Sequence, residues 1–334
     1  MVTKSFFVLL SRTYPYPLQR GIADARLLIL AVLFFISSCT TTRNFAIEIR
    51  EPAKITFPAD VSNVVVINNA ASPENGDSVI WVSASALTRG IFDEEFFSET
   101  MMYLEPVRRD TAYLEIRQIP NDIKQAIYTT TGADAIISID RFLLKYTQKV
   151  NKSVNQMSAS YSFVNAKTEV NITYSVYLRG KEKPLTSFVL QDSLFFSSEI
   201  IGDSTFLYDI LPNALIEETA IYIGEKAVPY FVPTWEKVER KLYTSLEAKM
   251  KEAFAYAKAN KWTTAKEIWL QLYDRKSNPK TQARLANNIA VAFEMQDDLH
   301  KALEWAQKAD NAPYISSLTE GIKNHSLLKL QLGN

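Results

Sequence analysis

The stretch VNITYSVYL at residues 170–178 decides the fold of the middle of this chain. Its aliphatic residues and Tyr174 stand at every second position, with Asn171, Thr173, Ser175 and Tyr177 between them. A period of two is typical of a strand with one face in the core and one face in water. The turn GKEKP at 180–184 leads into an apolar segment at 185–196, which predicts an antiparallel hairpin.

The segments before and after this hairpin alternate between strand and helix signals. The run NVVVIN is continuous and β-branched, as in strands buried on both faces. Capping residues, prolines and a glycine bound the helical segments. We predict strands at 63–68, 113–119 and 134–150, and helices at 93–106, 121–131 and 212–227, with a loop at 72–78.

The resulting order, β-α-β-α-β-β-β-α over residues 59–233, predicts a mixed sheet with helices packed on it, of the α+β or α/β class. The phrase GADAIISIDRF at 132–142, followed by the long hairpin, is similar to the small α/β domain of some periplasmic and secretion-associated proteins. These include the TolB amino-terminal domain and curli-secretion lipoproteins. The resemblance is one of pattern and implies a fold only.

Beyond residue 233 the composition shifts to Ala, Glu, Lys and Leu, which predicts an all-α domain over 234–334. The stretch NNIAVAFEMQDDLHKALEWAQKAD at 287–310 resembles a tetratricopeptide repeat, and KEAFAYAKANKWTTAKEIW at 251–269 resembles a weaker copy. The resemblance implies small or aromatic residues where paired helices meet closely. The matching residues are Ala253, Tyr256, Ala265, Trp269, Ala290, Phe293, Ala302 and Ala309.

Such repeats imply a concave surface that holds a peptide or a partner protein. The alternative is that these helices only brace the α/β domain, and the sequence leaves both interpretations open. Two repeats and a capping helix are close to the smallest stable array.

The amino-terminal segment indicates export and anchoring. An apolar run of ten residues, LLILAVLFFI at 27–36, has the length of a signal-peptide core and is too short for a membrane span. The residues ISSC at 36–39 resemble the lipobox of bacterial lipoproteins. The resemblance implies that residues 1–38 are a signal peptide, that Cys39 carries the lipid anchor to the bilayer, and that 39–58 form a tether.

The residues after Cys39 bear on location. Thr40 stands where Asp retains enterobacterial lipoproteins in the inner membrane, and TTTRNFAIEI lacks the acidic stretch that marks surface export in Bacteroidota-type lipoproteins. We therefore expect an outer-membrane anchor, facing the periplasm rather than the cell surface.

Composition argues against several classes of function. The only soft-metal ligands are His300, His325 and Cys39, so neither a metal nor another cofactor is expected. Without residues 1–38 the chain keeps 33 basic and 36 acidic residues, a net charge of −3, which disfavours nucleic acid. Asp134 and Asp140 share a predicted strand face but stand about 20 Å apart, too far for a carboxylate pair. We interpret them as strand-end and turn residues.

Together with the phrase VPTWEKVERKLY at 232–243, these features resemble an uncharacterised family of Bacteroidota lipoproteins. No catalytic motif is found, so the expected function is non-enzymatic, as a protein-protein interaction or scaffold module of the cell envelope. The alternative is an envelope hydrolase or glycan-binding lipoprotein with a cleft on the α/β domain. A deep cleft there would favour the alternative, whereas a groove on the repeats would favour docking.

Overall fold

The computed structural model describes residues 41–72, 77–108, 110–154, 160–201 and 205–333. The chain divides into two compact units. We call Met1–Phe45 with Glu239–Leu318 the helical unit, and Ala46–Val238 with Thr319–Asn334 the sheet unit. The division falls inside three elements, so each unit is described by itself.

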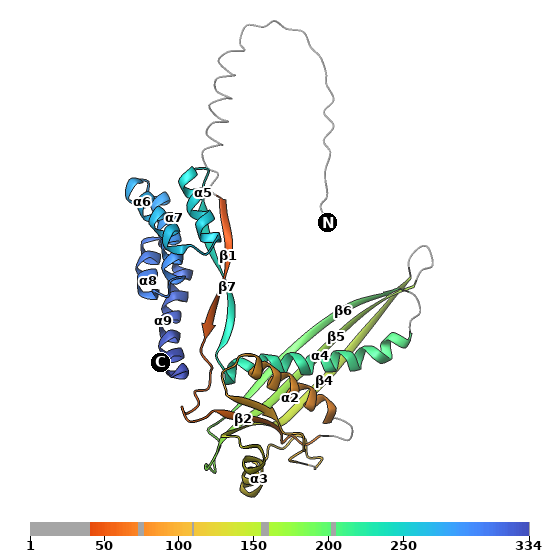
Figure 1. The fold of residues 1–334 in the computed structure, drawn as a ribbon. Coiled ribbons are helices and arrows are strands. Elements are labelled where there is room, and N and C mark those ends of the chain that lie inside the picture. Colours follow the sequence, from red (N-terminus) through yellow and green to blue (C-terminus); the bar gives the residue numbers. More distant parts are fainter. Residues whose placement is uncertain (1–40, 73–76, 109, 155–159, 202–204, 334) are drawn as a thin grey trace, which may run out of the picture. The chain divides into compact units, whose positions relative to one another are not determined.

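A five-stranded mixed sheet forms the centre of the sheet unit, in the order β3-β2-β4-β5-β6 (Figure 1). Strand β2 is parallel to both of its neighbours, and the long strands β4, β5 and β6 run antiparallel. The predicted mixed sheet and its hairpin are confirmed. The expectation that one face of 170–178 lies in water is wrong, because Thr173, Ser175 and Tyr177 are buried. The strands are β2 (Asn63–Asn68), β3 (Glu99–Met102), β4 (Ala135–Val154), β5 (Ser160–Leu178) and β6 (Thr186–Ile201).

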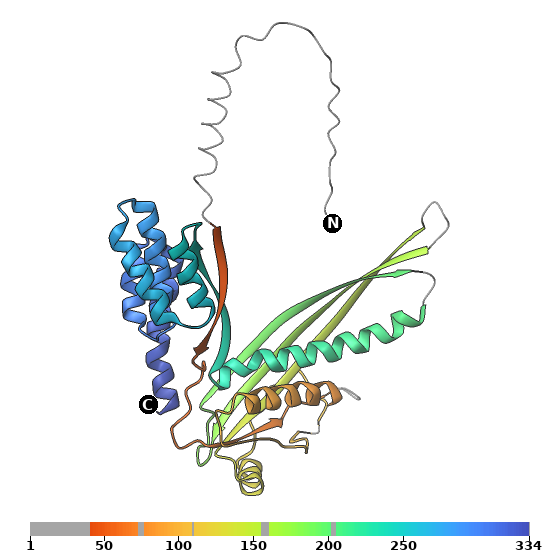
Figure 2. The same cartoon turned by 45° about the horizontal axis from the view of Figure 1, so that its top comes forward.

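Helices cover the two faces of this sheet unequally. Helices α2 (Asp77–Asp93) and α4 (Thr205–Phe231) pack side by side on one face (Figure 2). There Val64, Val66 and the even-numbered residues of β5 meet the apolar side of both helices. Helix α3 (Asn121–Thr131) covers only the β2 end of the other face, against Val65 and Ile67.

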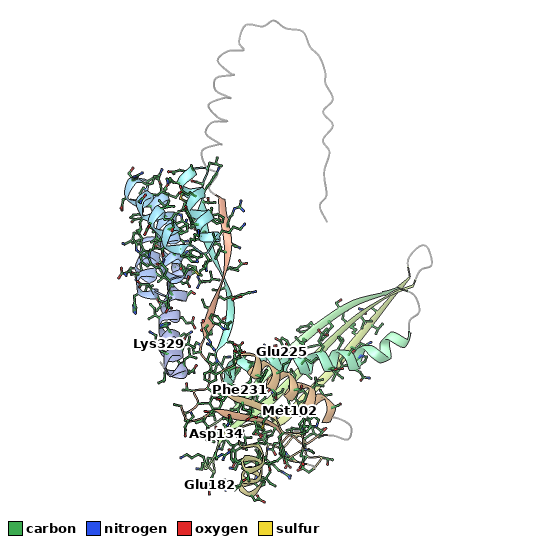
Figure 3. The ribbon with its side chains drawn as sticks, in the orientation of Figure 1. Met102, Asp134, Glu182, Glu225, Phe231 and Lys329 are labelled. Carbon is green, nitrogen blue, oxygen red and sulfur yellow. The ribbon has the colours of Figure 1, made fainter. Side chains whose placement is uncertain are left out.

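Two residues between α3 and β4 set where the sheet begins. Gly132 ends α3 in the left-handed conformation, with φ of 71°, as predicted from its position. Asp134, labelled in Figure 3, directly precedes β4. Its carboxylate accepts hydrogen bonds from the backbone N–H groups of Ser62 (3.1 Å) and Asn63 (3.0 Å). The starts of β2 and β4 are thereby fixed beside each other.

Two predicted elements of the sheet unit are wrong. The expected helix over 93–106 is replaced by the end of α2 and by β3, because Glu99–Met102 gains ladder hydrogen bonds along β2. The missed helix α2 has its own periodic signal in Ile80, Ala84, Leu87 and Ile91, all buried.

The expected strand over 113–119 is a loop. Its backbone carbonyls at Ala112 and Glu115 accept hydrogen bonds from the Arg108 guanidinium, which replaces a strand partner. Helix α4 begins at Thr205, so the start predicted at Pro212 is also wrong. A proline within a helix removes one backbone hydrogen bond, and the packing of α4 on the sheet offsets that loss.

A second, two-stranded sheet pairs β1 (Thr41–Glu51) with β7 (Thr234–Thr244). Neither strand was expected: β1 falls within the predicted tether at 39–58, and β7 falls at the start of the region predicted to be all-α from residue 234. The missed signal is the alternation of Phe45, Ile47 and Ile49 with Glu48 and Arg50.

The remainder of the helical unit is all-α, as predicted. Each of the helices α5 to α8 packs on the next along the chain, and their apolar faces form one core with Trp262, Trp269 and Ile289 inside it. The helices are α5 (Ala248–Lys258), α6 (Trp262–Arg275), α7 (Pro279–Glu294), α8 (Leu299–Lys308) and α9 (Ala312–Leu332).

The contact between α2 and α4 generates a stability prediction. A Cβ atom on Gly224 would lie 2.4 Å from the Ser83 carbonyl oxygen and 3.2 Å from the Leu87 backbone nitrogen. Because backbone atoms cannot move aside, we expect Gly224→Ala to lower the free energy of unfolding by about 1–3 kcal/mol in urea denaturation.

Gly321 in α9 provides a matched control in the same unit. A Cβ atom there meets nothing within 4 Å. Gly321→Ala is therefore expected to raise the free energy of unfolding by about 0.5–1 kcal/mol, through the helix preference of alanine. Equal effects of the two substitutions would contradict the proposed close approach of α2 and α4.

Candidate functional site

A pocket of about 230 Å³ opens on the helical unit. It lies where β7, α7 and the first turns of α9 meet, and six of its nine lining residues are polar. Val291, Pro313 and Tyr314 supply its apolar surface. The polar lining consists of Glu239, Arg240, Lys241, Asn287, Asn311 and Ser317.

Two consecutive asparagines of α7 attach this helix to β7. The Asn288 side chain accepts from the Tyr243 backbone N–H (2.8 Å) and donates to its carbonyl (2.7 Å), much as a neighbouring strand would. Asn287 donates to the Lys241 carbonyl (2.7 Å) and accepts from the Asn311 side chain (2.8 Å). Both asparagines are buried, so unmet hydrogen bonds here would be costly.

A buried ion pair forms the floor beside these amides. The Arg240 guanidinium donates to the Glu294 carboxylate through Nε (2.9 Å) and Nη2 (2.7 Å), and Nη2 also reaches the Ser317 hydroxyl at 3.2 Å. Tyr314 donates its hydroxyl to Glu294 Oε2, which also accepts from Arg240 Nε, at 2.6 Å. Burial, and then the charge of Glu294, raise the pKa of Tyr314 well above its usual range. The tyrosine is therefore a neutral donor throughout the physiological pH range.

The donors that remain available in the pocket are cationic. The third guanidinium nitrogen of Arg240, Nη1, makes one long contact of 3.5 Å to the Glu239 carbonyl. Lys241 is exposed at the rim. A group bearing carbonyl or carboxylate oxygens fits this arrangement, because such oxygens accept from arginine and lysine.

The residues predicted from the repeat pattern lie in the core of the same unit. Ala253, Ala265, Ala290 and Ala302 are fully buried, as is Trp269. Tyr256 and Phe293 pack against this core while partly exposed, and Ala309 is the half-buried cap residue after α8. None of these eight residues lines the pocket.

The pocket residues escaped the sequence analysis. The pair Asn287-Asn288 is the signal that could have indicated the pocket, because two asparagines are unusual on an otherwise apolar helix face. Both residues were instead interpreted as part of the tetratricopeptide-like repeat. Arg240 and Lys241 were not recognised as candidate site residues, because the residues of β7 were expected to be helical.

Cys39, the predicted lipid attachment residue, lies outside the described residues. Within the ranges that the structure covers, no helix has both the length and the apolarity required for a membrane span. Over the same ranges, no group of three or more His, Cys, Asp and Glu side chains is placed to hold a metal ion.

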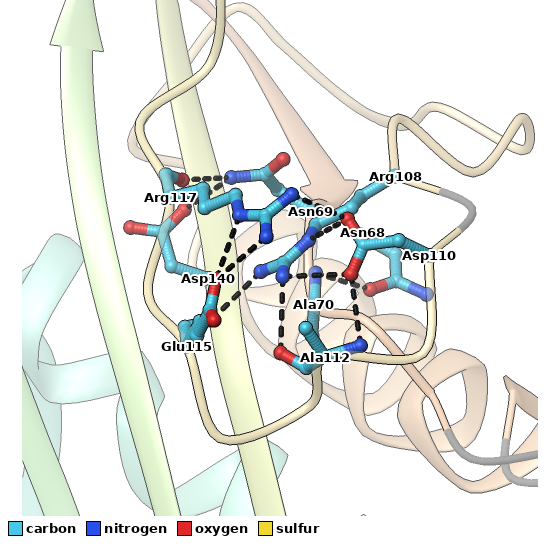
Figure 4. A network of polar contacts seen from close by, with 9 residues as sticks. All are labelled: Asn68, Asn69, Ala70, Arg108, Asp110, Ala112, Glu115, Arg117 and Asp140. Carbon is cyan, nitrogen blue, oxygen red and sulfur yellow. Dashed lines mark hydrogen bonds and ion pairs between the residues drawn. The ribbon is translucent and has the colours of Figure 1, made fainter.

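The sheet unit contains a second polar centre, which is closed (Figure 4). Arg108 is buried at the end of β3, and its guanidinium donates to both oxygens of Asp110 (2.7 and 2.8 Å) and to the carbonyls of Ala112 and Glu115. This hydrogen bonding holds the pKa of Asp110 at about 2. The network folds the loop between β3 and α3 back on itself, and four of the five N–H donors of Arg108 bind acceptors within it.

Asp140 is the buried carboxylate of this centre. It occupies a bulge in β4, where the register shifts between Ile139 and Arg141. The interpretation as a turn residue is therefore wrong, because Asp140 lies within the strand and shares the α3 face with Ile136 and Ser138 by ordinary strand alternation. Its carboxylate accepts from Asn69 (3.0 Å) and Ser138 (2.6 Å). Burial raises the pKa of Asp140, and these hydrogen bonds oppose the shift.

The raised pKa of Asp140 predicts a pH dependence of stability. An unfolded aspartate titrates near pH 4, at a pKa of about 3.9. Since the folded pKa is higher, the stability contributed by protonated Asp140 is fully present below that pH and is lost as the pH rises through the folded pKa. Asp140→Asn keeps an acceptor for Asn69 and does not titrate. We expect thermal denaturation to show the variant gaining stability relative to the wild type as pH rises through this window.

A difference between Asp140→Asn and wild type that stays constant from acidic to neutral pH would contradict this account. Asn69→Ala serves as the comparison, because it removes the donor to both Asp140 and the Arg117 carbonyl. That variant is expected to lose about 1–3 kcal/mol at neutral pH, because the buried Asp140 carboxylate loses one of its two donors and the Arg117 carbonyl loses its donor.

Comparison with solved structures finds 44 similar chains, and three of them illustrate the likeness. The PelC dodecamer subunit of Paraburkholderia phytofirmans is 11% identical, with a TM-score of 0.27 over 57% of this chain and 100% of its own. Rare lipoprotein B of Shewanella oneidensis is 9% identical, with a TM-score of 0.22 over 49% and 89%. A minor lipoprotein of Acinetobacter baumannii is 10% identical, with a TM-score of 0.24 over 53% and 98%. At these scores, no property of these proteins is transferred to this chain.

Comparison with the curated proteins gives no match. Two family models match the sequence, and both carry the description "Domain of unknown function". The model DUF6340 matches residues 251–330, in the helical unit and α9. The model DUF8603 matches residues 61–243, from before β2 to the end of β7. Because this second match takes in more than half of the chain, the protein belongs to the family of the domain of unknown function DUF8603.

Proposed function

We propose that this protein is a non-enzymatic lipoprotein of the bacterial cell envelope that docks a partner protein at the pocket of its helical unit. The observation that supports docking is that Arg240 and Lys241 have N–H groups available in that pocket to donate hydrogen bonds to a partner. The partner would present a short extended segment whose carbonyl or carboxylate oxygens accept from these cations.

The size of the pocket supports a peptide segment over an enclosed small molecule. Small-molecule sites usually measure about 300–1,000 Å³, and this pocket is smaller. Its surroundings are also rigid, since Asn287 and Asn288 hold α7 to β7 and Glu294 holds Arg240. A rigid site loses little conformational entropy when it binds.

A tetratricopeptide-like organisation of α5 to α8 forms part of the proposal. It rests on the repeat pattern and on the successive packing of these helices. The proposed anchor rests on the sequence ISSC at 36–39. Lipid on Cys39 would attach the protein to the outer membrane, facing the periplasm, after removal of residues 1–38. Each buried methylene of such a lipid contributes roughly 0.8 kcal/mol to membrane binding.

Charge reversal at the pocket rim tests docking. Lys241→Glu places a carboxylate where the partner's oxygens would lie, so we expect a loss of at least about tenfold in affinity, corresponding to roughly 1.4 kcal/mol. The measurement is recovery of envelope proteins with the full chain, by mass spectrometry, followed by titration of the recovered partner.

Lys251→Glu is the matched control, because Lys251 is exposed on α5, away from the pocket lining, and the change in net charge is the same. A partner that binds wild type and Lys251→Glu but not Lys241→Glu supports the site. A partner retained equally by both variants would exclude this pocket as the docking site.

Anchoring is tested separately at the thiol. Cys39→Ala is expected to abolish incorporation of radiolabelled palmitate and to release the protein from the membrane fraction. Ser37→Ala keeps a small residue before the cysteine, so its labelling should match the wild type. Unchanged labelling of Cys39→Ala would end the lipoprotein interpretation and would leave the docking site untouched.

A further inference from the structure

Strand β6 is an edge strand of the five-stranded sheet, and it is unusually long for one. Over the part of the chain that the structure describes, no strand pairs with its outer edge, although it runs sixteen residues from Thr186 to Ile201 (Figure 2). Its register with β5 continues without a bulge from Val176 opposite Thr186 to Tyr161 opposite Ile201. The strand therefore offers a row of backbone N–H and C=O groups for a further strand.

The features that usually protect edge strands are missing from its sequence. TSFVLQDSLFFSSEII contains no proline, glycine, lysine or arginine, and its two charged residues are Asp192 and Glu199. Two apolar side chains on the face away from α4 are largely in water, Val189 at 52% exposed and Phe195 at 77%. An exposed, apolar and regular edge is a site where another strand adds.

The sequence of β6 also indicates which strand would add. Around Asp192, residues 187–197 read SFVLQDSLFFS, a pattern that is nearly the same in both directions by chemical class. In an antiparallel pair with a two-fold axis at Asp192, Val189 faces Phe195 of the second copy, Leu190 faces Leu194, and Phe188 faces Phe196. Like side chains thus meet on both faces of the extended sheet, and apolar cross-strand pairs stabilise such sheets.

At the centre of this arrangement, the negative charge of each Asp192 is balanced by a cation of its own chain. Two Asp192 carboxylates facing each other would repel. Each is held within its own chain by Lys226 and by the Tyr222 hydroxyl, which donates at 2.7 Å, and it also accepts from the Ser193 N–H at 2.8 Å. The two-fold axis therefore brings together two cations and two anions.

We propose that two copies of this chain associate through their β6 strands, paired antiparallel about a two-fold axis at Asp192, so that two five-stranded sheets form one continuous sheet. A two-fold interface uses the same surface on both partners, which the self-complementary pattern of residues 187–197 satisfies. The proposal does not depend on docking at the helical unit.

Cysteine cross-linking tests the register. In full chains that carry Cys39→Ser, which removes the only native thiol, Val189→Cys and Phe195→Cys are prepared separately. The proposed register brings residue 189 of one copy opposite residue 195 of the other, whereas two residues 189 lie about 20 Å apart. A disulfide requires Cα atoms within about 7 Å. We expect covalent dimers on mild oxidation of the mixture and their loss when either variant is oxidised alone.

Sedimentation of the full chain tests association itself. The wild type is expected at twice the chain mass at micromolar concentration, and the double variant Val189→Lys with Phe195→Lys at the chain mass. Both positions are exposed, so circular dichroism should show an unchanged fold. Phe92→Lys is the control, because Phe92 is 64% exposed on α2, and this variant should remain a dimer. A monomeric wild type, or cross-linking of either single variant alone, would overturn the proposal.

Discussion

The close approach of α2 and α4 on one face of the sheet is the constraint on which the sheet unit depends. Gly224 and Gly90 mark this contact, since a Cβ atom on Gly90 would lie 2.4 Å from the Val228 side chain. Only without these Cβ atoms can both helices pack together and still cover β2, β4 and β5. The strands buried beneath them then carry the continuous apolar runs that the sequence shows.

Two long helices cover one face of the sheet, whereas the other face is covered only in part. Helix α3 and the loop held by Arg108 cover its β2 end, where Arg108 donates to the backbone carbonyls of that loop. Toward β6 the same face is open, and Val189 and Phe195 are exposed along a strand that lacks an outer neighbour in the described sheet. In the sheet unit, the polar centre around Arg108 is therefore buried, whereas the outer edge of β6 is exposed.

The two polar centres show how similar residue types lead to different chemistry. Arg108 is buried and gives four of its five N–H donors to Asp110 and to backbone carbonyls, so it offers little to a ligand. Arg240, which lines the pocket, is neutralised by Glu294 through two nitrogens, while Nη1 makes one long contact among the described residues. The two guanidinium groups differ because the tertiary structure brings different backbone and side-chain acceptors to each of them. No local sequence motif encodes this difference.

The sequence by itself determined the elements with strong local signals. Strict alternation at 170–178, the β-branched run of β2 and the glycine after α3 each act within a few residues, so their strands and helix were predicted correctly. The sequence also determined the palindromic pattern of β6. Tertiary structure alone decided the rest. Glu99–Met102 became a strand because β2 lies beside it, and residues 113–119 became a loop because Arg108 takes their carbonyls. The pocket combines β7, α7 and α9, from positions far apart in the chain, and such a meeting is fixed only when packing has chosen among many possible neighbours.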